Sequence, residues 1–232
     1  MGRLAVIGGT GVRDSAFGAD AEPVTVDGVP LLDAGNLVIL QRHGLGAYVR
    51  PHEIDHVANL RALDAAGCDR VLALSSTGSL RVDWPVGTVV CPDDFYAPQV
   101  NVTAHRDARS HTVPGFDPSW RARVLAAWDE HAATPIVDGG VYTQTRGPRF
   151  ETPAEVRALT RLGDLVGMTI AAECILSREL GLAYAAVCVV DNLANGLGAA
   201  PLTVAEFQAA VDANRVRLLA DLDAVLPVLA GG

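Results

Sequence analysis

Short apolar runs alternate with longer segments of helical periodicity along the chain. A short apolar run is typical of a buried strand, whereas an apolar repeat every three or four residues is typical of a helix. The runs predict strands at 4–7, 36–40, 71–74, 87–91, 135–143, 164–168 and 182–190. The periodic segments predict helices at 52–66, 118–132, 153–162, 171–180 and 203–225. Strands separated by helices favour an α/β fold with a largely parallel sheet.

One helix start is marked by several residues in the segment ETPAEVRALTRLG. Thr152 is a predicted N-cap, Pro153 suits the first helical position, and Glu155 completes a capping box. Gly163 is predicted to end this helix, because glycine readily adopts the left-handed conformation found at helix C-termini. Gly181 has the same predicted role for the next helix.

Length and composition predict one large domain over residues 1–232. Half of the residues are hydrophobic and 19% are charged, which is enough for a sizeable core. The net charge of −9, without a basic stripe, argues against nucleic acid as a partner. All 18 basic residues are arginines, so neither a Schiff-base lysine nor a P-loop lysine is available.

Cysteine usage and the N-terminal residues predict a cytoplasmic protein with no membrane segment. The four cysteines show no CxxC spacing and lie in apolar runs, at Cys68, Cys91, Cys174 and Cys188. This pattern is typical of small buried hydrophobic residues in a reducing compartment, and not of a metal site or a disulfide framework. The N-terminal apolar stretch is too short and glycine-rich for a signal peptide, and no apolar run approaches the roughly 18 residues of a membrane span.

Small polar segments lie at the ends of six predicted strands. They are GGTG, RHG, SSTGS, GPRFE, MT and DN, at residues 8–11, 42–44, 75–79, 147–151, 168–169 and 191–192. In open α/β sheets the ligand binds outside the carboxyl ends of the strands, so we expect the six segments to line one cleft. Each segment taken alone is equally consistent with a turn.

The polar groups of this cleft suit a free oxyanion such as inorganic phosphate. Thr10, Ser76 and Thr169 offer hydroxyl donors beside glycine backbones that a ligand can approach closely. Arg42 offers a planar fork that matches phosphate oxygens, and His43 is its neighbour. The set therefore predicts an anion subsite.

The first of these segments also allows a different interpretation, a dinucleotide-binding oxidoreductase. Gly9 and Gly11 fit the start of the glycine-rich fingerprint, but Asp14 stands where its third glycine should be. This function is therefore a remote alternative.

Longer stretches of the chain resemble a known family, in the same order and over nearly the whole length. They are VIGGTGV, RHG followed by RPHEIDHVANLRAL, SSTGSLR, TRGPRFETPAEVR and LGDLVGMTIAAECILSRELGLAYAAV. These stretches are similar to the trimeric branch of the purine nucleoside phosphorylase superfamily, specifically to methylthioadenosine and methylthioinosine phosphorylases. The resemblance implies a mixed sheet with helices on both sides and a homotrimer or a dimer of trimers. It also implies no metal and no cofactor, with inorganic phosphate as a co-substrate.

The implied reaction is phosphorolysis of a purine nucleoside. Phosphate attacks the anomeric carbon, and the purine leaves through a transition state that is positive on the sugar and negative on the base. Electrostatic stabilisation of these two charges is expected to dominate catalysis. By resemblance the phosphate-binding residues are Thr10, Arg42, His43, Ser76 and Thr169. The predicted catalytic residues are Arg42 and His43 at the phosphate and Asn192 at the departing base.

The resemblance also assigns the residues that contact the base and the ribose. Phe150 matches the aromatic residue that packs on the purine, and Met168 matches the methionine at the ribose hydroxyls. Asn192 matches the position that contacts N7 and the six-substituent, where adenosine-type members carry an Asp. Glu151 matches an acid that accepts from the purine N1–H, a donor that adenine lacks. The two residues favour a 6-oxopurine, with the reservation that a shift by one residue would place Asp191 at the base.

The expected 5′ pocket completes the assignment. Val204 and Phe207 fall where phosphorylases of ordinary nucleosides place a histidine near the 5′-hydroxyl, and an apolar lining accepts a methylthio group better than a hydroxyl. His111 matches a loop histidine that the family inserts from a neighbouring subunit. The predicted substrate is therefore 5′-methylthioinosine or an inosine- or guanosine-type nucleoside. Methylthioadenosine phosphorolysis, hydrolysis in place of phosphorolysis, and a non-catalytic nucleoside-binding module are the alternatives.

Overall fold

Four parallel strands form the middle of the sheet in the computed structural model. The structure describes residues 2–13, 15–198 and 201–231, so Asp14 lies outside the described residues. The central strands pair in the order β4 (Leu37–Gln41), β1 (Arg3–Gly8), β5 (Cys68–Ser79) and β11 (Ala183–Leu193). Along β1, Ala5 and Ile7 join one apolar core while Leu4 and Val6 join another. Both faces are buried, which is why these strands appear as uninterrupted apolar runs in the sequence.

The remaining strands extend this sheet on both sides. A hairpin of β2 (Glu22–Val26) and β3 (Val29–Ala34) continues it antiparallel from β4. Beyond β11 the sheet adds β6 (Val89–Cys91), which is antiparallel to β11, and β8 (Ile136–Asp138), which is parallel to β6. The end of β5 also pairs with a third branch, made of β10 (Leu165–Gly167), β9 (Val141–Gln144) and β7 (Asp94–Tyr96). The sheet is therefore mixed, with mostly parallel pairs, and branches at β5.

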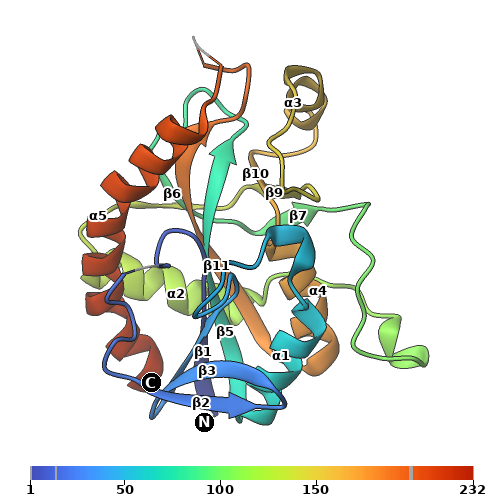
Figure 1. Cartoon of the computed structure of the whole chain (residues 1–232), viewed down its shortest axis with the longest axis vertical. Coiled ribbons are helices and arrows are strands. Elements are labelled where there is room, and N and C mark those ends of the chain that lie inside the picture. The colour runs from blue at the N-terminus through green and yellow to red at the C-terminus, as the bar shows by residue number, and fades with distance from the viewer. Residues whose placement is uncertain (1, 14, 199–200, 232) are drawn as a thin grey trace.

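Helices cover both faces of the central strands (Figure 1). On one side lie α1 (His56–Ala65) and α4 (Ile170–Leu180), which pack on each other. On the other side lie α2 (Pro118–His131) and α5 (Val204–Gly231). The short helix α3 (Pro153–Leu159) and two 3₁₀ turns, η1 (Pro51–Glu53) and η2 (Ala108–Ser110), lie in connecting segments. The predicted α/β fold with a largely parallel sheet between helices is confirmed.

The capping signals give a mixed outcome. The predicted box is present, because Thr152 Oγ1 accepts from the Glu155 amide at 3.3 Å and the Glu155 carboxylate accepts from the Thr152 amide at 2.8 Å. Gly181 ends α4 with a φ of 76°. The prediction for Gly163 is wrong, since α3 ends at Leu159 and a turn fills the interval. Local turn bonds end this helix before the glycine is reached.

Several predicted boundaries need correction. The single strand predicted at 135–143 is two strands, β8 and β9, because Gly139 and Gly140 between them have φ values of 99° and 115°. The strands β2, β3 and β7 were not predicted, since their apolar content is low. The last helix continues to Gly231, past Pro227.

The predicted burial of the cysteines is confirmed, because all four are free and buried. Burial raises the pKa of Cys68, Cys91 and Cys174 to about 12, so these thiols stay protonated. Among the described helices, none has the length and apolar character needed to cross a membrane.

Candidate active site

A cavity of about 380 Å³ opens where the strand ends meet. The predicted cleft residues in its lining are Thr10, Arg42, His43, Ser76, Phe150, Glu151, Met168, Thr169, Asn192 and Phe207. They come from the ends of β1, β4, β5, β9, β10 and β11 and from the first turn of α5. The expectation that scattered strand ends line one cleft is therefore met. Two predictions need refinement, since the SSTGS segment lies inside β5 and the DN segment lies inside β11, rather than after these strands.

Arg42 is held by protein groups more tightly than expected. Its Nε and Nη2 donate to the two carboxylate oxygens of Glu173, at 2.7 and 2.9 Å, and its Nη1 donates to the Leu74 carbonyl at 2.6 Å. One edge of the planar fork that was predicted to match phosphate oxygens, formed by Nε and Nη2, is thus occupied by Glu173. Two of its five N–H groups, one on each terminal nitrogen, have no acceptor among the described residues, and the side chain is 1% exposed at the wall of the cavity. Glu173 lies 131 residues away in sequence, and a local motif cannot reveal such a partner.

His43 is poised as a neutral acceptor. Its Nδ1 lies 2.9 Å from the Val49 carbonyl, so Nδ1 carries the proton and Nε2 is the acceptor. Burial, followed by the charge of Arg42, lowers the pKa of His43 to about 4. The ring stacks on Tyr48 with centroids 5.4 Å apart. At neutral pH His43 therefore offers a lone pair rather than a positive charge.

Thr169 is available to a ligand at the start of α4. It is the N-cap residue of α4, but its side chain makes no capping bond. Its own amide donates to the Tyr142 hydroxyl at 3.3 Å. This bond satisfies one of the backbone N–H groups that have no partner within the helix. Thr169 lines the cavity together with Arg42 and Ser76, and its hydroxyl is not used to cap α4.

The structure places the side chains of Asp191 and Asn192 in different surroundings. A register shift in β11 leaves Val190 opposite Thr77 and Asn192 opposite Gly78, so Asp191 is an extra, bulged residue. The Asp191 carboxylate turns toward α5 and accepts from Asn214 Nδ2 at 2.7 Å. Burial raises the pKa of Asp191, although the bonds from Ser76 and Asn214 act in the opposite direction. Asn192 lines the cavity, as predicted.

Glu151 and the two phenylalanines shape the other end of the cavity. Thr145 donates its hydroxyl to Glu151 Oε1 at 2.6 Å, which leaves Oε2 without a partner among the described residues. Phe150 meets Phe207 edge to face, with ring centroids 5.4 Å apart at 65°. The result is an apolar wall beside one buried, oriented carboxylate oxygen.

Two predicted site residues lie outside this cavity. Val204 is 71% exposed at the first residue of α5, one helical turn before Phe207, and it does not line the cavity. Gln208 lines the cavity instead, so the lining beside Phe207 is less apolar than predicted. Sequence position alone could not show where along α5 the cavity ends.

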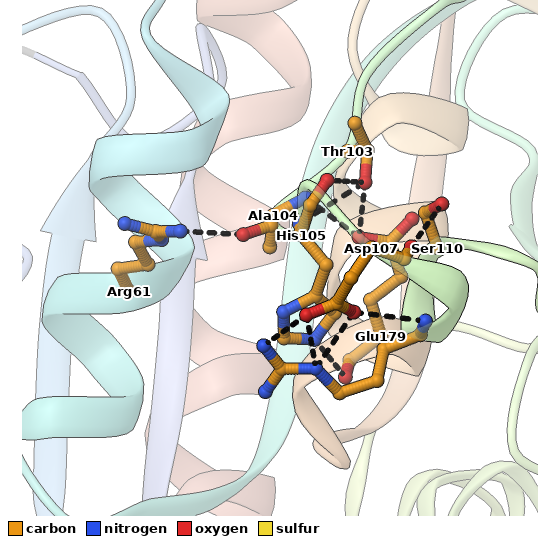
Figure 2. A network of polar contacts seen from close by, with 8 residues as sticks. Arg61, Thr103, Ala104, His105, Asp107, Ser110 and Glu179 are labelled. Atoms are coloured by element: carbon orange, nitrogen blue, oxygen red, sulfur yellow. Dashed lines mark hydrogen bonds and ion pairs between the residues drawn. The ribbon is translucent and has the colours of Figure 1, made fainter.

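His111 lies on an exposed arm between β7 and α2. Figure 2 shows the network that fixes the base of this arm on α4: Glu179 Oε2 accepts from the Thr103 hydroxyl at 2.9 Å and from the Ala104 amide at 2.6 Å. Arg61 of α1 donates to the Ala104 carbonyl. Within one chain, His111 does not line the cavity.

Glu173, which lies behind the cavity, was not predicted as a site residue. The unpredicted residues in the lining include Arg13, Tyr48, Gln208 and Arg215. The available signal for Glu173 was a single acid in an otherwise apolar helix segment, TIAAECIL, where an unpaired charge would be costly. No group of three or more histidine, cysteine or acidic residues in the described part of the chain could hold a metal ion.

Comparison with known proteins identifies the family. Residues 4–227 match the sequence profile described as the Phosphorylase superfamily. The chain belongs to the phosphorylase superfamily. A relative from Archaeoglobus fulgidus, named as a probable 6-oxopurine nucleoside phosphorylase, is 36% identical over 202 residues, which cover 84% of this chain and 83% of the relative.

A second relative agrees with this phosphorylase-superfamily membership, and a solved structure agrees with the fold. A relative from Xanthomonas campestris, named as a probable S-methyl-5′-thioinosine phosphorylase, is 37% identical over 232 residues, covering 90% of this chain and 91% of the relative. Methylthioadenosine phosphorylase from Schistosoma mansoni, solved with adenine, superposes with a TM-score of 0.83 over 99% of this chain and 92% of that one. At 23% identity this second likeness shows the fold alone.

Proposed function

We propose that this member of the phosphorylase superfamily catalyses phosphorolysis of 6-oxopurine nucleosides, giving the free base and a ribose 1-phosphate. The observation that carries the proposal is the joint lining of one cavity by an anion set at one end and by Glu151 with Asn192 at the other. The names of the relatives from Archaeoglobus fulgidus and Xanthomonas campestris support the same reaction class.

At the phosphate end, directional bonds hold the nucleophile. The two remaining N–H groups of Arg42 and the hydroxyls of Thr10 and Thr169 donate to phosphate oxygens, whereas the buried Ser76 hydroxyl is directed at Asp191. His43, being neutral, accepts a hydrogen bond at Nε2 from the hydroxyl of the monohydrogen phosphate dianion, and the proton stays on phosphate. A phosphate oxygen then bonds to the anomeric carbon as the bond to the purine nitrogen breaks and its electron pair passes to the base. The remaining phosphate charge stabilises the sugar cation.

At the base end, Asn192 and Glu151 select the purine. Asn192 donates from Nδ2 to the keto oxygen or to the developing negative charge at N7. Glu151 Oε2 accepts from the purine N1–H, which hypoxanthine and guanine carry and adenine lacks. A buried carboxylate left without its donor disfavours adenine nucleosides. This pair supports a 6-oxopurine over the alternative, methylthioadenosine.

The 5′ side of the site accommodates more than one substituent. Phe207 offers an apolar ring to a methylthio group, and Gln208 beside it offers an amide to a hydroxyl. We therefore propose 5′-methylthioinosine together with inosine- and guanosine-type nucleosides as the substrate class.

The oligomer and the cellular location belong to the same proposal. We propose a homotrimer, or a dimer of trimers, in which the arm that carries His111 reaches the cavity of a neighbouring subunit. The exposed arm and its fixed base support this arrangement. Light scattering at several protein concentrations tests it, and a monomer at all of them would contradict it.

We also propose a cytoplasmic location, which is supported by the four free, buried cysteines.

Product analysis tests the reaction. Inosine, guanosine, adenosine and the 5′-methylthio forms of inosine and adenosine are incubated with and without phosphate. We expect phosphate-dependent release of hypoxanthine or guanine, with a higher kcat/KM for the 6-oxopurine compounds. Equal release without phosphate would indicate hydrolysis, and a preference for the adenine compounds would contradict the base assignment. Binding of hypoxanthine without turnover would indicate a non-catalytic module.

A further inference from the structure

A buried carboxylate lies behind the phosphate end of the cavity without lining it. Glu173 stands in the first turn of α4, and its side chain is 1% exposed. A buried carboxylate is costly unless it is paired and fully hydrogen-bonded. Its ion-pair partner is Arg42, which does line the cavity. Glu173 is therefore an energetically costly buried carboxylate that lies directly behind Arg42, a proposed phosphate-binding residue.

The hydrogen bonds of Glu173 leave little freedom to either partner. Both of its oxygens accept from Arg42, and Oε2 also accepts from the Tyr184 hydroxyl at 2.8 Å. Tyr184 is itself fully buried on β11. The Leu74 carbonyl of β5 takes a third N–H of Arg42. The guanidinium is thus fixed in its plane by groups from α4, β5 and β11.

The backbone of Glu173 connects this arrangement to a second phosphate-end residue. Its amide donates to the Thr169 carbonyl at 3.3 Å, within the same first turn. Thr169 and Arg42 therefore share one rigid support. His56 Nδ1, at 3.8 Å from Glu173 Oε1, is too distant for a hydrogen bond.

We propose that Glu173 is a positioning residue for phosphate: it orients Arg42 so that only two N–H groups face the ligand, and it cancels the arginine charge. This inference rests on the proposed phosphorolysis. Its consequence is that Arg42 recognises phosphate by the direction of its hydrogen bonds rather than by its charge, whereas Arg13 and Arg215, which also line the cavity, keep their electrostatic attraction in every Glu173 variant. Loss of Glu173 then weakens phosphate binding even though it removes a negative charge from the neighbourhood of an anion.

The direction of this effect separates the proposal from simple electrostatics. If charge alone mattered, Glu173→Gln would tighten phosphate binding, because Arg42 would be left as an uncompensated cation. If orientation matters, the same substitution turns one oxygen into an amide donor facing an arginine N–H, and the guanidinium rotates away. We expect KM for phosphate to rise on the order of 10- to 100-fold, the usual effect of losing a group that orients a ligand-binding residue. KM for inosine should change less than about 2-fold.

A matched control removes a buried carboxylate elsewhere. Asp221 on α5 is also buried and accepts from the Ala133 and Thr134 amides, away from the cavity. Asp221→Ala leaves these two amides without their acceptor, so it should lower the thermal stability as Glu173→Gln does, and leave both KM values near the wild-type ones. If both variants lose thermal stability but only Glu173→Gln raises KM for phosphate, the positioning role of Glu173 is identified.

Two further variants keep the test decisive if Glu173→Gln folds poorly. Tyr184→Phe removes a single bond to the carboxylate, and it should raise KM for phosphate less than Glu173→Gln does. Glu173→Asp retains the charge and should recover part of the loss. In an Arg42→Gln background, Glu173→Gln should add less than about 2-fold, because the two residues act as one unit.

Phosphate binding to the free enzyme is measured by calorimetry beside the steady-state kinetics. Weaker phosphate binding in Glu173→Gln and Tyr184→Phe, with unchanged KM for inosine, supports the proposal. Unchanged or tighter phosphate binding in either folded variant, or effects of Glu173→Gln that add fully to those of Arg42→Gln, would overturn it. If the wild-type enzyme binds phosphate but releases no base, the proposed function fails, whereas the calorimetric comparison still tests Glu173.

Discussion

Gly9 allows the loop after β1 to approach the phosphate end of the cavity closely. A Cβ atom at this position would lie 2.6 Å from Arg42 Nη1 and 2.6 Å from the Leu74 carbonyl oxygen. Ordinary contacts of a Cβ atom begin near 3.4 Å. In Gly9→Ala the new Cβ atom must therefore lie roughly 0.8 Å farther from both Arg42 Nη1 and the Leu74 carbonyl oxygen. Neither neighbour can yield, because the Leu74 carbonyl belongs to β5 and Arg42 is fixed by Glu173. The loop that carries Thr10 must therefore move.

A displacement of about 1 Å can cost on the order of 100-fold in rate, and overpacking of this kind costs about 1–3 kcal/mol of stability. We expect Gly9→Ala to raise KM for phosphate at least about 10-fold and to change KM for inosine little. Gly11→Ala is the matched control, since its added Cβ would meet only the tip of Leu218, at 3.2 Å. Steady-state kinetics with each substrate varied in turn is the assay. Equal effects of the two alanines, or no effect of Gly9→Ala, would refute the reasoning.

Three further outcomes follow from the site geometry. Asn192→Asp should lower the preference for inosine over adenosine by roughly 5- to 100-fold, about 1–3 kcal/mol for one mispaired buried group, and unchanged selectivity in kcat/KM would remove Asn192 from the base site. Glu151→Gln should lower kcat/KM for inosine more than for adenosine, and an equal loss for both would contradict a bond to N1–H. His43 stays neutral in the fold because its pKa is lowered from 6.5 to about 4, so its contribution to stability is complete above pH 6.5 and is lost as the pH falls toward 4. Urea unfolding of wild type and His43→Gln should show a stability difference that shrinks by about 3 kcal/mol between pH 7.5 and pH 4, and a pH-independent difference would argue against a neutral His43.

Much of the central architecture could be predicted from local pattern, because its strands are buried on both faces. The apolar runs of β1, β4, β5 and β11 stand out for this reason. The hairpin of β2 and β3 lies at the edge of the sheet, where half of the side chains face water, so its apolar signal is weak. The turn that joins β2 and β3 contains Asp27 and Gly28, both with positive φ. This Asp-Gly pair was the best sequence signal for the hairpin.

The site was predictable as a set of strand ends but not in its detailed contacts. Asn192 faces the cavity only because a bulge at Asp191 changes the alternation of β11, and no residue pattern specifies that bulge. The arginine fork is occupied because Glu173 folds back from α4, a contact set by tertiary packing. Val204 was placed in the site by position along a helix, but the end of the cavity depends on how α5 lies against the sheet.

The most direct test of the central claim is a crystal structure with inorganic phosphate and hypoxanthine bound together. We predict phosphate at the two remaining N–H groups of Arg42 and beside Thr169, with hypoxanthine between Asn192 and Glu151 Oε2, both ligands in the one cavity. Phosphate and hypoxanthine in separate places, or hypoxanthine bound without contact to either Asn192 or Glu151, would contradict the account.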